Sequence, residues 1–209
     1  MRRLLLALAL CIPAAWAAGQ AADAAPDVLV RSITDEVSGI LKQDKDIQAG
    51  DPKKIAALVE TKILPHFQLA RMTQLAVGRN WRLATPEQQK QLTTEFMTLL
   101  VRTYSAALTA YRDQAVNVKP LRAAAAATDV TVHAEVRQSG QQPVSIDYDL
   151  EKTAEGWKVY DVKVGGVSLV TTYRETFANE VRDHGVDGLI QSLSSKNRQS
   201  DGKFKASKT

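Results

Sequence analysis

Ser168 is the first residue of this chain that could carry chemistry. It lies in Gly166-Val167-Ser168-Leu169-Val170, between a predicted strand and a predicted helix, where the G-x-S-x-G motif of serine hydrolases places its nucleophile. The last position of the motif is Val170, but the tight turn needs a small residue there. The only histidine downstream is His184, and no acid stands in an evident triad context. The pattern predicts that Ser168 is not a nucleophile, and a serine hydrolase is kept as the alternative.

Three carboxylates form a second candidate. Asp147 and Asp149 point to the same face of one predicted strand, and Asp161 lies on the next strand. Paired carboxylates can hold a metal ion or exchange protons. The same face also carries His133 and Glu135, as a solvated sheet face does. We therefore interpret these carboxylates as part of a solvated face.

The histidines and glycines show no further chemical motif. His66, His133 and His184 are far apart in the sequence, and no pair of them has the spacing of metal ligands. No glycine-rich phosphate-binding loop is present. The sequence thus predicts no catalytic residue, no metal and no cofactor, and a protein that is not an enzyme.

The apolar residues that follow the last predicted strand must be shielded from water by other apolar groups. The pair Gly165-Gly166 breaks the strand, yet Val167, Leu169 and Val170 follow it. Loops are normally polar, so these side chains either pack under the protein's own helices or face an apolar ligand or partner. An adaptor with a filled core, which binds no such ligand, is the second alternative.

The first residues have the pattern of an export signal. Arg2 and Arg3 precede a short apolar core, Leu4 to Ile12, and Ala15-Trp16-Ala17 matches a cleavage site. Residues 1–17 are therefore predicted to be a signal peptide that directs the protein to the periplasm. Cys11, the only cysteine, lies within it, so the mature chain has no disulfide. Removing the two arginines lowers the net charge from +4 to about +2, which does not indicate nucleic-acid binding.

Helices are predicted in the first half of the mature chain. Apolar residues recur at helical spacing from Pro26 to Leu41, and Asp51-Pro52 begins a second helix that Pro65 ends. A short helix follows and closes at Gly78. The segment Thr85-Pro86-Glu87-Gln88 is a capping box, and the helix after it extends to about Arg112.

The second half changes to the alternation of strands. Strands are predicted from Val116, over 130–136, over 144–150 and over 156–164, and the short turns between them imply antiparallel pairing. A helical region from Tyr173 to about Leu193, interrupted at Gly185, closes the domain. The architecture is α+β, one domain over residues 26–195, with a basic tail over residues 196–209 that is predicted to be disordered.

Several segments match one protein family in order. They are GRNWRLATPEQ (78–88), RTYSAALTAY (102–111), SIDYDL (145–150), GWKVYDVKVGGVSLVTTYR (156–174) and GVDGLI (185–190). The chain closely resembles the MlaC-type, toluene-tolerance family of periplasmic phospholipid-binding proteins over nearly its whole mature length. One departure is Gln68, where the family commonly has Asp, which puts a capping or polar role at this position in doubt.

The resemblance implies a fold and a function. The fold is a helical sub-domain packed on a curved antiparallel sheet of about four strands, nuclear-transport-factor-like, enclosing an apolar cavity. The ligand is a glycerophospholipid, held as cargo with its acyl chains inside. The implied task is to shuttle lipid between the two membranes and so maintain outer-membrane asymmetry.

The resemblance also implies the partners and, together with the apolar faces, the residues that bind lipid. The implied partners are an inner-membrane ABC transporter complex with an MCE-type ring protein and an outer-membrane lipoprotein–porin complex, and a monomer is expected. The residues predicted to contact lipid are Met72, Leu75, Trp81, Phe96, Leu100, Tyr104, Leu108, Val132, Ile146, Tyr148, Tyr160, Val162, Val167, Leu169, Val170 and Tyr173.

Overall fold

The computed structural model describes residues 24–110, 114–122, 124, 126–137 and 142–206. Within the two longest helices, residues 106–110 and 200–206 are described by their backbone. The predicted signal peptide, residues 1–17, lies outside the described residues. No helix in the described part of the chain is long and apolar enough to cross a bilayer.

Helices make up the first half of the chain. They are α1 (Pro26–Gln43), α2 (Lys45–Gln48), α3 (Pro52–Leu58), the π-helical turn η1 (Val59–Ile63), the 3₁₀ turn η2 (Leu64–His66), α4 (Leu69–Val77), the 3₁₀ turn η3 (Gly78–Leu83) and α5 (Pro86–Ala110). The predicted helices are confirmed in order and closely in their limits.

The capping residues read from the sequence have the expected geometry. Asp51 accepts hydrogen bonds from the backbone N–H groups of Lys53 and Lys54 at 2.8 and 3.2 Å. In the capping box, the Gln88 N–H donates to Thr85 Oγ1 at 3.2 Å, and the Thr85 N–H donates to Gln88 Oε1 at 2.9 Å. Gln68 is the N-cap of α4, but its side chain makes no capping hydrogen bond within the described residues.

The strands form one antiparallel sheet. They are β1 (Ala115–Val118), β2 (Asp129–Arg137), β3 (Val144–Thr153), β4 (Gly156–Val164) and β5 (Val167–Ser168), in the spatial order β1-β2-β3-β4-β5. The sequence predicted about four strands. The fifth arises because Val167 pairs with Val164 and Ser168 with Lys163 across the Gly165-Gly166 turn, where both glycines have positive φ.

A β-bulge in β4 changes which side chains share a face. Asp149 pairs with Asp161, but Leu150 pairs with Val159, so Tyr160 has no direct partner on β3. Val159 and Val162 therefore both belong to the apolar cluster on one face of the sheet, whereas Tyr160 packs against the helical cluster. The sequence shows the same shift, since Val159 and Tyr160 are adjacent apolar residues in an otherwise alternating strand.

The chain ends in a long kinked helix. The 3₁₀ turn η4 (Thr171–Tyr173) leads into α6 (Arg174–Ala206), which bends at Gly185. Gly185 has φ 71°, as the predicted interruption requires. The helix continues beyond the predicted limit near residue 195, so residues 196–206 are helical where a disordered tail was expected. Asn197 explains the continuation, because it is buried and its side-chain amide donates to the Glu95 carbonyl at 3.0 Å.

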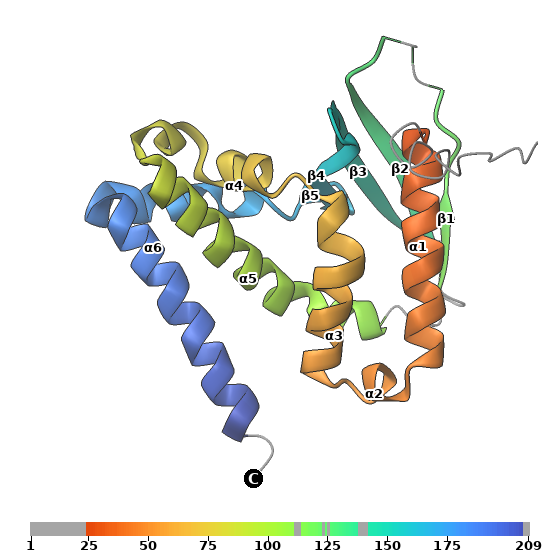
Figure 1. Cartoon of the computed structure of the whole chain (residues 1–209), viewed down its shortest axis with the longest axis horizontal. Helices are drawn as coiled ribbons and strands as arrows, with labels where there is room; N and C mark the ends of the chain where they lie inside the picture. The colour runs from red at the N-terminus through yellow and green to blue at the C-terminus, as the bar shows by residue number, and fades with distance from the viewer. Residues whose placement is uncertain (1–23, 111–113, 123, 125, 138–141, 207–209) are drawn as a thin grey trace, which may run out of the picture.

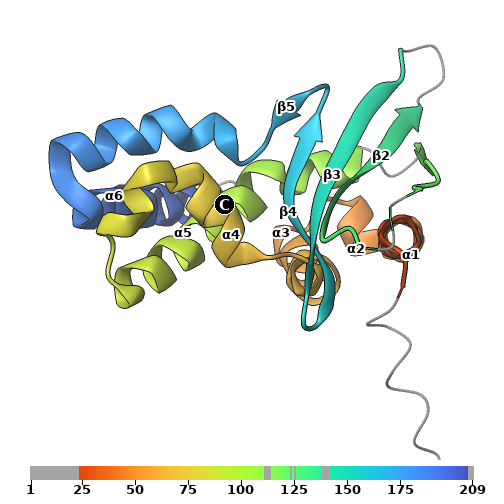
Figure 2. The same ribbon diagram turned by 90° about the horizontal axis from the view of Figure 1, so that it is seen from above.

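The molecule has a helical part and a sheet part. Figures 1 and 2 both show α4, α5 and α6 together on one side, and the sheet with α1 on the other. One apolar cluster fills the helical part, a second lies between α1 and the sheet, and a third joins α1, α2 and α3. The fold is thus α+β, as predicted, with helices packed on a curved sheet that does not close on itself.

Two links hold the helical part to the sheet. The backbone N–H of Gln68 donates to the Val159 carbonyl at 2.8 Å, next to an isolated bridge between Phe67 and Val159. The second link is the guanidinium of Arg71 on α4, which binds Asp129 at 3.0 Å and Glu151 and lies 3.7 Å from the centre of the Tyr160 ring. These contacts fix the start of α4 against the edge of the sheet.

Candidate functional site

The residues predicted to contact lipid separate into two groups. The group in the helical cluster consists of Met72, Leu75, Trp81, Phe96, Leu100, Tyr104, Tyr160, Val170 and Tyr173. The group on the apolar face of the sheet consists of Val132, Ile146, Tyr148 and Val162. The structure brings each group together within itself but assigns the two groups to different clusters.

The helical group has a closely packed centre. Phe96 is fully buried and meets Tyr173 and Phe177 edge-on, each with ring centroids 5.2 Å apart. Val170 is also fully buried in this cluster. Because Phe96 and Val170 have no free surface in this state, a ligand can contact these two side chains only if the surrounding helices separate.

The sheet group is more open. Val132 is fully buried, but Ile146, Tyr148 and Val162 are half-buried and pack at the edge of their cluster. Tyr148 stands in the middle of β3, with Val132 and Val162 as its partners on the neighbouring strands. This part of the sheet is therefore where an apolar ligand meets the least competition from the protein's own side chains.

Val167 and Leu169 lie outside both clusters. Val167 in β5 is 60% exposed, and Leu169 is half-buried. Leu108 lies in the part of α5 that is described by its backbone. The apolar run after β4 is thus only partly covered, because Val170 enters the core while Val167 does not.

The enclosed apolar cavity implied by the resemblance does not appear among the two most evident pockets of the described residues. One, of about 510 Å³, lies between the start of α5 and Ile190 of α6, and the other, of about 360 Å³, lies beside the β3–β4 turn. Neither is lined by any of the predicted lipid-contacting residues; the first is lined mainly by polar side chains and the second by polar and apolar side chains in equal number.

The tyrosine hydroxyls differ in how they are satisfied. The Tyr160 hydroxyl donates to Asp129 Oδ1 at 2.7 Å. Tyr104 lies near Tyr173, and burial together with this neighbour raises the pKa of Tyr104 to about 12. The Tyr148 hydroxyl has no hydrogen bond with any residue that the structure describes, and burial alone raises the pKa of Tyr148 to about 12. On the sheet, therefore, the Tyr160 hydroxyl has a protein partner and the Tyr148 hydroxyl has none among the described residues.

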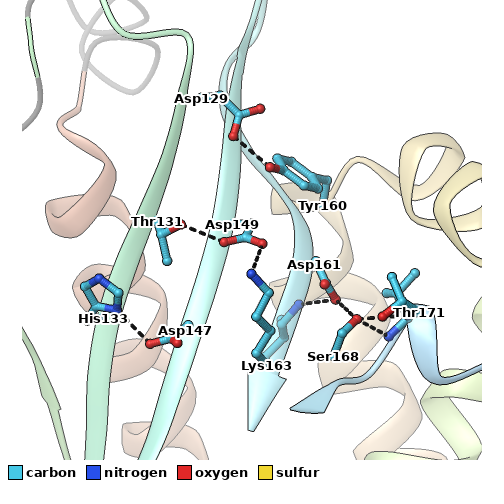
Figure 3. A network of polar contacts seen from close by, with 12 residues as sticks. Asp129, Thr131, His133, Asp147, Asp149, Tyr160, Asp161, Lys163, Ser168 and Thr171 are labelled. Atoms are coloured by element: carbon cyan, nitrogen blue, oxygen red, sulfur yellow. Dashed lines mark hydrogen bonds and ion pairs between the residues drawn. The ribbon is translucent and has the colours of Figure 1, made fainter. Parts of the chain in front are cut away.

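The opposite face of the sheet carries a ladder of polar contacts (Figure 3). The Thr131 hydroxyl donates to Asp149 Oδ1 at 2.8 Å, and Lys163 Nζ lies 2.6 Å from the other oxygen of Asp149. His133 Nδ1 lies 2.7 Å from Asp147 Oδ1. The described residues contain no group of three or more side chains suited to a metal ion.

Two carboxylates of this face are buried, so the interpretation of a simple solvated face is wrong for them. Asp149 is 8% exposed and Asp161 is 3% exposed. Asp161 is covered because the chain after the Gly165-Gly166 turn folds back over β4, which brings Ser168 against it. Burial raises the pKa of the Asp161 carboxyl, and the charge of Asp149 adds to the rise, while the hydrogen bond from Ser168 opposes it.

Ser168 has a structural role in this geometry. Its hydroxyl donates to Asp161 Oδ1 at 2.9 Å and accepts from the backbone N–H groups of Val170 and Thr171 at 3.2 and 2.9 Å (Figure 3). The same hydroxyl thus caps η4 and anchors β5. His184 is in α6, paired with Glu180, and takes no part in this arrangement.

The apolar cluster around Tyr148 contains residues that were not predicted from the sequence to contact lipid. Leu29 and Val30 of α1, Phe67, and Leu150 and Val159 of the sheet all belong to the cluster around Tyr148. Their apolar periodicity was visible, but periodicity gives the buried face of an element and not the element that it meets.

Comparison with known proteins identifies close relatives. A family profile described as "MlaC protein" matches residues 31–195. The chain is 22% identical over 175 residues to the "Intermembrane phospholipid transport system binding protein MlaC" of Haemophilus influenzae, covering 82% of each chain. It is 27% identical over 188 residues to the "Toluene tolerance protein ttg2D" of Pseudomonas putida, covering 90% of this chain and 85% of that protein.

A solved structure is also similar. It is that of the phospholipid-binding protein from Ralstonia solanacearum in complex with a phospholipid, which is 43% identical to this chain. The two structures superpose with a TM-score of 0.79, covering 85% of this chain and 99% of the other.

Proposed function

This chain belongs to the MlaC protein family, and from that premise we propose that it is a periplasmic carrier of glycerophospholipids. It takes up one lipid at a time, with the acyl chains against the apolar face of the sheet and the head group toward solvent. It then passes the lipid between an inner-membrane ABC transporter complex with an MCE-type ring and an outer-membrane lipoprotein–porin complex, which maintains the asymmetry of the outer membrane.

The observation that carries this proposal is the relative from Ralstonia solanacearum. That protein was solved with a phospholipid, and its similarity to this chain spans almost its entire length. The half-buried apolar residues Ile146, Tyr148 and Val162 give this chain a surface of suitable chemistry, and the pattern of residues 1–17 supports export to the periplasm.

The energetics suit a carrier. Burying some 30 methylenes of two acyl chains is worth about 25 kcal/mol relative to water, at ~0.8 kcal/mol each. A bilayer already keeps these chains dry, so the net free energy of exchange between bilayer and protein is small. Extraction through water is then the slow step, and docking to a membrane complex removes it.

The close packing inside the helical cluster also fits this proposal. A lipid-free carrier lowers its free energy by covering its apolar surfaces, and a ligand replaces these contacts when it enters. The proposal therefore includes separation of the packed helices α4, α5 and α6 where an acyl chain reaches the helical cluster.

The test is the lipid content of the protein. The mature chain, purified mildly from a Gram-negative host, is weighed by native mass spectrometry, and its chloroform extract is analysed for phospholipid. We expect an added mass of one phospholipid on most molecules. Folded protein without lipid, from a preparation in which a known phospholipid-binding protein keeps its ligand, would refute the proposal.

A serine hydrolase is not favoured by any observation, because the Ser168 hydroxyl is already bound by Asp161 and two backbone N–H groups. Release of fatty acid from the bound lipid by the purified protein would overturn the assignment as a carrier without catalytic activity.

A further inference from the structure

Tyr148 places a hydroxyl in apolar surroundings. It lies between Val132 and Val162 on the neighbouring strands, and Ile146 and Leu150 flank it on β3. All four neighbours are aliphatic. A phenol in such a place has lost most of its contact with water, and a polar group in that position is stabilised only when a partner forms a hydrogen bond to it.

That partner does not come from the described part of the protein. On the neighbouring strand, the Tyr160 hydroxyl donates to Asp129, whereas the Tyr148 hydroxyl has no hydrogen bond with any described residue. Among the described residues, the only completely buried side-chain nitrogen or oxygen without a hydrogen-bond partner is Asn197 Oδ1. The Tyr148 oxygen therefore keeps some solvent-accessible surface, and a molecule that enters from outside can reach it.

The side chains around Tyr148 limit which chemical group of a ligand can bind its hydroxyl. A phosphate is charged and would lose its hydration among the aliphatic neighbours of Tyr148. A methylene chain fits the aliphatic neighbours but offers nothing to a phenol. An ester carbonyl is neutral, accepts a hydrogen bond, and sits at the start of each acyl chain of a glycerophospholipid.

We infer that the Tyr148 hydroxyl donates a hydrogen bond to an acyl-ester carbonyl of the bound lipid, and so sets how deep the lipid enters and favours ester-linked over ether-linked lipids. This inference rests on the proposed function, because it assigns a contact within the lipid complex. The head group then remains outside the apolar cluster, at a depth fixed by the glycerol ester and independent of head-group chemistry.

The test compares two lipids that differ only in the linkage. Lipid-free protein is mixed with vesicles of a diester phosphatidylglycerol or of its diether analogue, and bound lipid per protein is measured in competition. For the wild type we expect preference for the diester by roughly fivefold, the factor that one net hydrogen bond of ordinary strength provides. Tyr148→Phe, which removes only the hydroxyl, should bind both lipids equally.

Thr131→Val is the matched control. It also deletes a hydroxyl from the sheet, but from the opposite face, where Thr131 binds Asp149. We expect this variant to lose thermal stability and to keep the diester preference. A preference that disappears equally in both variants would assign the effect to general destabilisation and overturn the inference.

The other outcomes are also decisive. If the wild type binds diester and diether lipids equally, the ester contact is absent although the carrier function stands; if it binds neither lipid, the proposed function fails. A preference retained by Tyr148→Phe assigns the contact elsewhere. If Tyr148→Phe does not fold, infrared spectra of the wild type loaded with carbonyl-labelled lipid test the contact instead. A hydrogen-bonded ester carbonyl absorbs at lower frequency than a free one, so a band at the free frequency would overturn the inference.

Discussion

Glutamate substitutions at Val167 and Val170 should have opposite consequences, although the two residues are only three positions apart. Val170 is 0% exposed in the helical cluster, whereas Val167 is 60% exposed in β5. We expect Val170→Glu to prevent folding. Val167→Glu should fold but lose bound phospholipid, because an acyl chain that covers this position would bury the new carboxylate.

The magnitudes follow from burial. Val170→Glu loses about 2 kcal/mol of apolar burial and leaves an unpaired charge in the core, which costs several kcal/mol more. The sum, roughly 5–7 kcal/mol, is comparable with the whole stability of a typical domain, about 5–15 kcal/mol. At Val167 only the covered part of the side chain contributes apolar burial energy. Val167→Glu therefore loses roughly 0.8 kcal/mol of stability, or about 2–3 °C in the unfolding temperature.

The assay pairs thermal unfolding with phospholipid bound per protein after extraction. Val28→Glu is the control, since Val28 is 53% exposed on α1 and is not among the residues predicted to contact lipid. This variant should keep both its stability and its lipid. Full lipid loading of folded Val167→Glu would show that Val167 does not contact the ligand, and stable folding of Val170→Glu would refute the assignment of Val170 to a closed core.

Two further predictions concern the buried polar contacts of β4 and β5. Ser168→Ala should lower the free energy of unfolding by about 1–3 kcal/mol, because it removes the cap of η4 and a hydrogen bond to a buried carboxylate. Urea denaturation measures this change, and Ser168→Thr should recover most of the lost stability. An unchanged stability of Ser168→Ala would contradict the capping role. Because burial raises the pKa of Asp161 above its unfolded value, its contribution to stability is present below the unfolded pKa and is lost as pH rises through the folded pKa. As the pH rises through this range, the free energy of unfolding of the wild type should fall relative to that of Asp161→Asn. If the difference in unfolding free energy between the two proteins does not change with pH, Asp161 does not have a raised pKa in the folded protein.

The sequence by itself determined the elements of this fold and the family. Alternation along residues 130–136, 144–150 and 156–164 predicted three strands, because one face of each is apolar and one polar. Asp51 and the capping box at Thr85 marked helix starts by local hydrogen bonds, which depend on residues within one turn. The family resemblance rested on segments such as residues 156–174, and the match over residues 31–195 agrees with it.

Only the tertiary structure decided what each face meets. The bulge at Asp149/Leu150 directs Tyr160 to the helical cluster, and the fold-back of β5 buries Asp161. Both depend on register between segments, which periodicity within one segment does not contain. For the same reason, thirteen of the predicted residues, which look alike as apolar positions, separate into two clusters, and only the structure shows that the Tyr160 hydroxyl has a partner and the Tyr148 hydroxyl has none among the described residues.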